Sequence, residues 1–214
     1  LWIAEKYPSG RVLCVSNSNS QREFILAEAR RRGLKNLEAT TADVNDFHPE
    51  GPFDRVISVE MFEHMRNVEA LLDRIAKSLA PGGRLFVHVF CHREFAYFYE
   101  DHGSGDWMAR HFFTGGTMPS HDLYLQLQSK LVVEERWQID GTHYEKTLLA
   151  WLKKTDDARD EILEIFQEVY GPDQASVWFH RWRVFFISCA ELFGYKEGRE
   201  WWVSHYLFRP VDET

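Results

Sequence analysis

Cysteine is scarce in this sequence, and the spacing of the cysteines argues against a disulfide framework and a structural zinc site. The 214 residues contain three cysteines, Cys14, Cys91 and Cys189, and no two of them form a C-x-x-C pair. A disulfide framework or a structural zinc site needs more cysteines at closer spacing. We therefore expect free thiols, no metal site and a reducing compartment, the cytoplasm.

Long apolar runs and an excess of basic residues are also missing. No run approaches the ~20 apolar residues of a membrane-spanning helix, and residues 1–8 carry no basic leader, so we expect no stable membrane insertion. The formal net charge of -8 argues against nucleic acid as a partner, because such binding neutralises phosphates with Lys and Arg. It fits a cationic ligand, and it leaves the oligomeric state open.

The sequence does contain regularly alternating strand and helix patterns. Hydrophobic residues make up 44% of the chain, enough for one domain over residues 1–214. Apolar runs predict strands at 11–16, 36–43, 53–59 and 85–90, and helical spacing predicts helices at 21–32 and 68–79. This alternation predicts an α/β fold with a mostly parallel sheet.

The second half of the chain is less regular. Between about residues 92 and 127 the period is lost and Gly, Pro and aromatic residues accumulate, as in a substrate-covering insertion. A strand at 130–137 precedes two long helices at 144–169 and 175–193, and an aromatic strand at 200–209 follows. We expect lid segments at about 92–127 and 142–195.

Two acids and a histidine follow the buried strand at 53–59. A helix beginning just after Glu60 would place Glu60, Glu63 and His64 on one face, where two carboxylates and an imidazole can meet one substrate. The alternative is an ordinary helix start, whose acidic residues favour the positive end of the helix dipole.

Six strings occur in an order that resembles a known family. They are VSNSNSQREFI, ISVEMFEHMRN, LAPGGRLFVH, FFTGGTMPS, HYEKTLLAWL and FGYKEGREWWVSHYLF. The chain resembles a class I S-adenosylmethionine-dependent methyltransferase of the coclaurine N-methyltransferase and cyclopropane-fatty-acid synthase family. The resemblance implies a Rossmann-like sheet, S-adenosylmethionine as cofactor and methyl transfer to the nitrogen of a small aromatic or alkaloid-like amine.

The resemblance also implies which residues hold the cofactor. Asn17, Ser18 and Gln21 correspond to the contacts with the cofactor ribose, and Asp43 and Val44 correspond to the pair that holds the adenine. The alternative for the first three is loop and helix capping, and for Asp43 it is a turn.

In the same family, Glu60, Glu63 and His64 correspond to the active-site cluster. An amine attacks only when it is neutral, so a carboxylate would attract the ammonium form, His64 would accept its proton and Glu60 would position the nitrogen. The cyclopropane synthase branch usually has a small residue where Glu60 stands, so Glu60 favours N-methylation over methylene transfer to unsaturated phospholipids. A degenerate, non-catalytic module is the third possibility.

Aromatic residues in the first insertion are candidates for substrate contact. Tyr97, Trp107, Phe112 and Phe113 are expected to form a wall for a flat ring or a cation. For any one of them, ordinary core packing is an equal alternative.

The sequence departs from the family at its beginning. Residues 1–8 are typical of the end of a helix that started upstream, so the first strand and the Gly-rich cofactor loop of the family are expected to be missing. Loss of a central strand leaves buried N–H and C=O groups unpaired at about 1–3 kcal/mol each, so we expect this chain alone to fold poorly and to bind the cofactor weakly, and an upstream-extended form to bind it.

Overall fold

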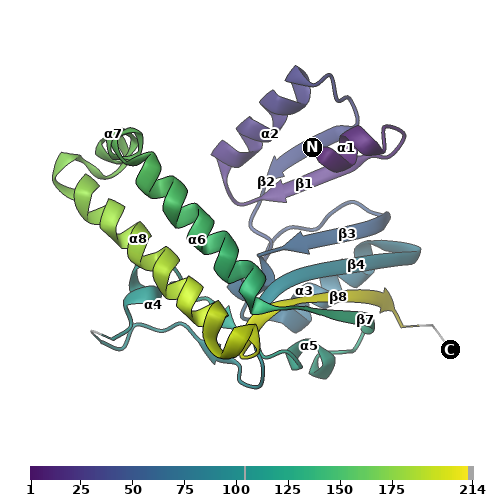
Figure 1. The fold of residues 1–214 in the computed structure, drawn as a ribbon. Coiled ribbons are helices and arrows are strands. Elements are labelled where there is room, and N and C mark those ends of the chain that lie inside the picture. The colour runs from purple at the N-terminus through teal and green to yellow at the C-terminus, as the bar shows by residue number, and fades with distance from the viewer. Residues whose placement is uncertain (104, 212–214) are drawn as a thin grey trace. The chain divides into compact units, whose positions relative to one another are not determined.

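A computed structural model describes residues 1–103 and 105–211 of the chain (Figure 1). The chain forms two compact units, Leu1–Glu50 and Gly51–Thr214. The expected single methyltransferase domain over residues 1–214 stays a prediction. Each unit has its own sheet and its own buried residues.

The first unit is a small α/β layer. It contains α1 (Trp2–Lys6), β1 (Val12–Ser16), α2 (Asn19–Arg31) and β2 (Leu37–Thr41). β1 and β2 are parallel, with Val12 opposite Leu37 and Ser16 opposite Thr41. Because the two strands run in the same direction, the residues that follow Ser16 and Thr41 lie at the same end of the sheet. A small core of Ala4, Ala29 and Leu37 packs beneath α1 and α2.

The Asn36 side chain fastens the start of this unit. Its amide nitrogen lies 3.1 Å from the carbonyl of Ala4, 3.1 Å from that of Tyr7 and 2.8 Å from that of Gly10. Replacing Asn36 with alanine removes this donor from all three carbonyls, of which that of Tyr7 keeps the backbone N–H of Gly10 at 3.0 Å, so we expect residues 1–50 to lose about 1–2 kcal/mol of stability. Hydrogen exchange of the β1 and β2 amides measures the loss. Lys35→Ala, at the exposed neighbouring position, is the control; equal protection in the two variants would contradict the role of Asn36.

The second unit has a four-stranded mixed sheet in the order β3-β4-β8-β7. Its strands are β3 (Phe53–Val59), β4 (Leu79–His92), β8 (Trp201–Pro210) and β7 (Leu131–Ile139). β3 and β4 are parallel, whereas β8 runs antiparallel to both β4 and β7. β4 also begins earlier than the sequence predicts, because Leu79 pairs with Phe53; the register then shifts, and regular pairing resumes at Arg84 opposite Arg55.

One face of this sheet carries the main core of the unit. Side chains of β4 and β8 on this face are fully buried, among them Leu85, Val87, Val89, Tyr206 and Phe208. Helix α3 (Val68–Ser78) contacts β4 and β7, and the short α5 (Leu123–Gln126) contacts β7. The Asn67 side chain caps α3 by accepting a hydrogen bond from the backbone N–H of Ala70 at 3.1 Å.

The irregular segment between β4 and β7 contains short elements. They are β5 (Tyr97–Phe98), α4 (Trp107–His111), β6 (Thr117–Met118) and α5. β5 and β6 pair as a two-stranded antiparallel sheet, and the backbone N–H of His92 bonds to the carbonyl of Pro119 at 2.9 Å. The expected lid role of this segment stays a prediction.

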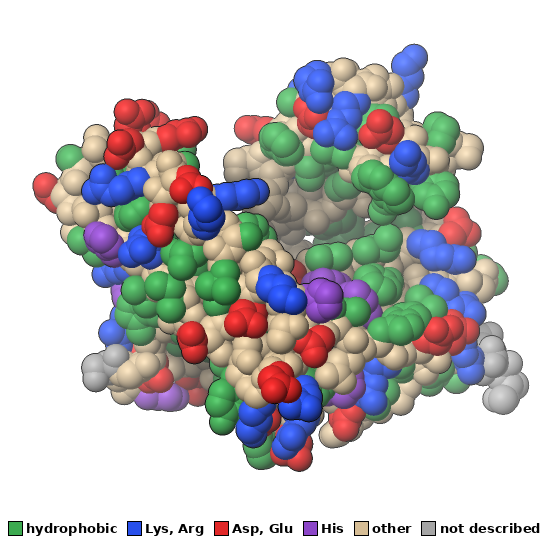
Figure 2. Space-filling model, in the orientation of Figure 1, with side chains coloured by type: hydrophobic (Ala, Val, Ile, Leu, Met, Phe, Trp, Pro, Cys, Tyr) green, Lys and Arg blue, Asp and Glu red, His purple; other side chains and the backbone are tan. Residues whose placement is uncertain are grey.

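Three helices form an arm between β7 and β8, where the sequence predicts two. They are α6 (Gly141–Asp157), α7 (Arg159–Tyr170) and α8 (Pro172–Gly194). The unpredicted break is at Ala158, whose φ of -100° and ψ of 24° end α6 without a glycine or proline. Figure 2 shows acidic side chains gathered at this end of the arm, where residues 156–164 turn from α6 into α7. Within the described residues, no helix is both long and apolar enough to cross a bilayer.

Candidate functional site

The turn after β3 brings the predicted acids to the end of the sheet. β3 ends at Val59, and the backbone N–H of Glu60 still bonds to the carbonyl of His88 at 3.0 Å. Glu60 itself has a φ of 50°, a left-handed conformation that is uncommon outside glycine and turns the chain out of the strand. A 3-10 turn, Phe62–His64, follows in place of the expected α-helix, so the turn and not a helical face arranges these side chains.

Glu60 and Glu63 form an interacting pair of carboxyl groups. Glu63 is almost fully buried, with 1% of its surface exposed. Burial raises the pKa of Glu63 to about 8, and the charge of Glu60 and a hydrogen bond between the two side chains contribute to the rise. Glu63 therefore keeps its proton at neutral pH and can donate a hydrogen bond. Glu60 is the neighbouring acid whose charge acts on Glu63.

His88 and Tyr144 lie beside this pair, although sequence reasoning assigned neither a role. His88 Nε2 is 2.9 Å from Glu60 Oε1. Burial raises the pKa of the Tyr144 hydroxyl, and Glu60 and Glu63 raise it further, so this hydroxyl interacts electrostatically with both acids. The available signals were the pairing of β3 with β4, which sets His88 opposite Val59, and the family-like string HYEKTLLAWL, which contains Tyr144.

His64 lies on the same turn but is exposed, and its ring stacks on Phe113. The ring centroids are 5.4 Å apart at 17°. Phe113 also contacts Tyr99, at 5.0 Å between centroids, and Tyr97 contacts Tyr99 at 5.7 Å. Two of the four aromatic residues expected to contact substrate, Phe113 and Tyr97, thus belong to one cluster next to His64.

The other two aromatic candidates pack elsewhere. Phe112 stacks on Phe185 of α8 with centroids 4.5 Å apart, and it meets the edge of Trp182 at 5.0 Å. Trp107 contacts Phe112 at 5.3 Å. Trp107 and Phe112 therefore pack α4 against the arm, as expected if these aromatic residues serve ordinary core packing. Their expected contact with substrate stays a prediction.

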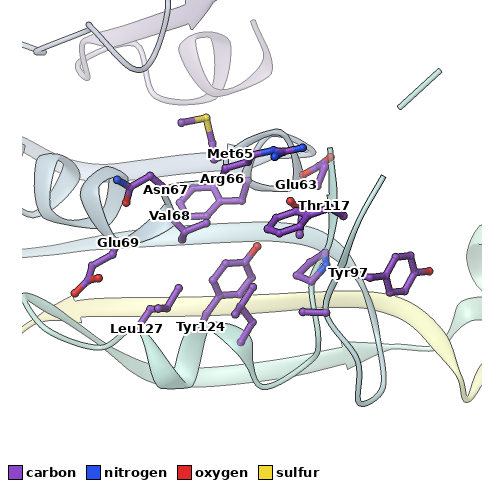
Figure 3. Close-up of a pocket in the computed structure, with 15 residues that line it drawn as sticks. Glu63, Met65, Arg66, Asn67, Val68, Glu69, Tyr97, Thr117, Tyr124 and Leu127 are labelled. Carbon is purple, nitrogen blue, oxygen red and sulfur yellow. The ribbon is translucent and has the colours of Figure 1, made fainter. Parts of the chain in front are cut away.

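A cavity of about 320 Å³ reaches Glu63 from the side of α3 and α5. Its walls are mostly apolar, and they include the rings of Phe62, Tyr97 and Tyr124. Figure 3 shows Glu63 and Thr117 at one end of the cavity and Glu69 and Leu127 at the other. The Glu63 Oε2 and Thr117 Oγ1 atoms are buried and make no hydrogen bond among the described residues, so this end of the cavity offers two buried polar atoms to a ligand.

The five residues expected to hold the cofactor all lie at one end of the small β1–β2 sheet. Ser18 is the N-cap of α2, and its hydroxyl accepts the backbone N–H of Gln21 at 3.3 Å. Asn17 is exposed in the same loop, and Asp43 and Val44 follow β2. Ser18 is therefore a helix cap, as the alternative interpretation of this loop proposed. The expected contact of Ser18 with a cofactor stays a prediction.

Polar atoms in this group remain available for a ligand. Gln21 Oε1 accepts a hydrogen bond from the Ser16 hydroxyl at 2.6 Å. This bond fixes the orientation of the amide and leaves its N–H₂ group available to donate to a ligand. Asp43 Oδ1 accepts two hydrogen bonds from Asn45, at 2.8 and 2.9 Å, as expected for a turn residue. Its Oδ2 takes no hydrogen bond within the described part of the chain. One donor and one acceptor at the same sheet end fit a ribose or an adenine amine.

Known proteins resemble the chain over nearly its whole length. It is 40% identical over 213 residues to (S)-coclaurine N-methyltransferase of Thalictrum flavum subsp. glaucum, covering 98% of this chain and 59% of the relative. It is 36% identical over 212 residues to pavine N-methyltransferase of the same plant, covering 98% of this chain and 60% of the relative. The chain thus spans about three fifths of the length of these curated relatives.

A solved structure agrees with these sequence matches. The crystal structure of coclaurine N-methyltransferase bound to N-methylheliamine and S-adenosylhomocysteine (SAH) matches with a TM-score of 0.91 and 38% identity, covering 97% of this chain and 62% of that chain. The α/β fold of a class I methyltransferase, predicted from the sequence, is confirmed. The family model described as mycolic acid cyclopropane synthetase matches residues 3–199. The chain belongs to the mycolic acid cyclopropane synthetase family.

Proposed function

We propose that the protein is an S-adenosylmethionine-dependent methyltransferase that methylates the nitrogen of a small, alkaloid-like amine. The observation that carries the proposal is the Glu60–Glu63 pair at the end of β3, in which a buried, protonated acid supports a charged one. The 40% identity to a coclaurine N-methyltransferase and the likeness to its solved structure support the choice of an amine.

The proposed roles follow from charge and exposure. The Glu60 carboxylate attracts the ammonium form of the substrate, while neutral Glu63 offers a hydrogen bond and adds no second charge. His64, exposed and stacked on Phe113, accepts the proton that the ammonium loses. The lone pair freed on nitrogen then forms the new N–C bond, and the C–S bond breaks with its electron pair remaining on sulfur. Positioning of the neutral nitrogen supplies much of the rate.

Gln21, Asp43 and the loop of Asn17 and Ser18 would hold the cofactor. S-Adenosylmethionine, when bound, supplies an electrophilic methyl group on a positively charged sulfur. Gln21 would donate to a ribose oxygen, and the free oxygen of Asp43 would accept from a hydroxyl or the exocyclic amine. Val44 would line the base.

The experiment follows methyl transfer to two classes of acceptor. Protein expressed from its complete coding sequence is incubated with S-adenosylmethionine labelled in the methyl group, together with either a panel of secondary isoquinoline amines or vesicles of unsaturated phospholipid. We expect label on the amine and none in the lipid. Label in cyclopropane lipid would replace the proposal with the synthase function, and no transfer to either acceptor would contradict it.

Replacement of His64 tests the proton acceptor. We expect His64→Ala to lower kcat/KM for the amine about 10²- to 10⁴-fold at neutral pH, with a smaller loss at high pH, where the free amine is already neutral. Initial rates between pH 6 and 10 measure the effect. His180→Gln, on the exposed surface of α8, is the control and should leave the profile unchanged. Equal loss by His64→Ala at all pH values would rule out its role as a base.

A further inference from the structure

Glu60 is connected to a second histidine through His88. His88 Nε2 lies 2.9 Å from Glu60 Oε1, and His88 Nδ1 lies 2.9 Å from His205 Nε2. His88 and His205 are register partners in the β4–β8 ladder, and their ring centroids are 4.9 Å apart. Two strands that are far apart in sequence thus place three polar side chains in one continuous row.

The Glu60 end of the row needs a donor. Glu60 Oε1 is buried and makes no well-directed hydrogen bond among the described residues, although it is within ion-pair distance of His88. An ionised carboxylate only accepts hydrogen bonds. The contact is therefore favourable when His88 carries a proton on Nε2, and it is repulsive when the proton is on Nδ1 and Nε2 presents a lone pair.

His205 and Glu60 together determine which of these forms His88 adopts, because a neutral His88 that donates from Nδ1 to a bare His205 Nε2 would present a lone pair to the Glu60 carboxylate. A neutral imidazole has one N–H, and the partner of its other nitrogen selects the tautomer. If His205 Nε2–H donates to a bare His88 Nδ1, the single proton of His88 must sit on Nε2, facing Glu60. If His205 Nε2 is bare instead, a doubly protonated His88 donates to both neighbours. Both arrangements keep a proton between His88 and Glu60.

The surroundings of His205 keep this ring neutral. Burial lowers the pKa of His205, and the charge of His88 lowers it further. The ring of Phe86 on β4 lies 5.1 Å from it, and its register partner on β7 is Trp137; neither can carry a charge. Among the described residues named here, the titratable neighbour that acts on His205 is therefore His88.

We propose that His205 is a positioning residue that acts through His88: it sets the His88 tautomer and so orients the Glu60 carboxylate that receives the substrate ammonium. The role of Glu60 in this statement rests on the proposed function, whereas the tautomer of His88 does not. His205 touches no substrate in this scheme. It acts on Glu60 indirectly, through the His205–His88 contact and the His88–Glu60 contact, each 2.9 Å long.

The tautomer is measured directly by ¹⁵N NMR of the histidine side chains in protein without substrate. In the wild type we expect the His88 signal to show a protonated Nε2. In His205→Phe, which keeps a ring but loses both nitrogens, Glu60 still favours a proton on Nε2, but His205 no longer opposes the Nδ1–H form, so the population of that form should rise above the wild-type level. His205→Gln, whose amide can replace Nε2 as donor or acceptor, should restore the wild-type signal. An unchanged His88 signal in His205→Phe would overturn the proposal, whether or not the protein methylates amines.

Kinetics provide the second readout. We expect His205→Phe to lower kcat/KM for the amine about 10- to 100-fold and to shift the pH profile, with the affinity for S-adenosylmethionine unchanged. His205→Gln should recover most of this loss, and His180→Gln should lose nothing. Equal impairment of His205→Phe and His205→Gln, with an unchanged pH profile, would indicate a structural role and overturn the proposal. A wild type that transfers no methyl group would contradict the proposed function and leave the NMR result as the test of His205.

Discussion

Replacing Glu63 with glutamine will make the protein more stable at alkaline pH and impair methyl transfer. The pKa of Glu63 is about 8 in the folded protein, against an ordinary value of 4.5. Between these values the folded state holds a proton that the unfolded chain has released, so this group lowers the free energy of unfolding as pH rises. Glutamine is neutral at every pH and avoids that cost.

The expected stability difference between Glu63→Gln and the wild type follows from the gap between the two pKa values of Glu63. Between pH 5 and 8, the stability of Glu63→Gln relative to the wild type should rise by on the order of 3 kcal/mol. The difference between the two proteins is the informative quantity, because half-buried histidines such as His121 and His205 have lowered pKa values and change stability in the opposite direction. Urea unfolding at several pH values measures it. Glu161→Gln, on the exposed surface of α7, should show no such trend, and a flat difference for Glu63→Gln would contradict a raised pKa.

Adding a single methyl group at Gly141 will destabilise the second unit strongly. Gly141 begins α6, where a Cβ atom would overlap the backbone carbonyl oxygens of Phe193, at the end of α8, and Trp201, at the start of β8. Backbone atoms cannot rotate away as a side chain can. Gly141→Ala must therefore separate the base of the arm from the sheet, and we expect a loss of about 3 kcal/mol or more.

Chemical unfolding and hydrogen exchange together test this expectation. The amides of α6 and α8 near their junction with β8 should lose protection in Gly141→Ala before those of α3 do. Gly103→Ala is the matched control, because an added Cβ there meets nothing within 4 Å. If Gly141→Ala unfolds within 1 kcal/mol of the wild type, the close packing at this junction is not what holds the arm in place.

Local patterns in the sequence were sufficient for most strands. The run at 53–59 predicted β3 to the residue, because an apolar segment between turn residues has few alternatives. The predicted strand at 200–209 corresponds to β8 at Trp201–Pro210. The arm was predicted less well, since the break at Ala158 has no glycine or proline to mark it.

The site was only partly predictable for a different reason. Glu60, Glu63 and His64 are close in sequence, so their proximity follows from one short turn. His88 meets Glu60 because β4 pairs with β3, and His205 meets His88 because the C-terminal strand inserts between β4 and β7. The His88–His205 contact depends on strand register across more than a hundred residues, which residue patterns do not encode. The 3-10 turn likewise replaced the expected helix because Glu60 adopts a left-handed conformation.

The carboxylate of Glu60 is the group on which the proposed chemistry depends most. The most direct measurement compares the wild type with Glu60→Gln in transfer of a labelled methyl group to a secondary isoquinoline amine, at saturating S-adenosylmethionine. Glutamine keeps the size of the side chain and removes the charge that attracts the ammonium, so we expect kcat/KM to fall by about 10²-fold or more while cofactor affinity is retained. Methyl transfer by Glu60→Gln at the wild-type rate would contradict the central role of this acid.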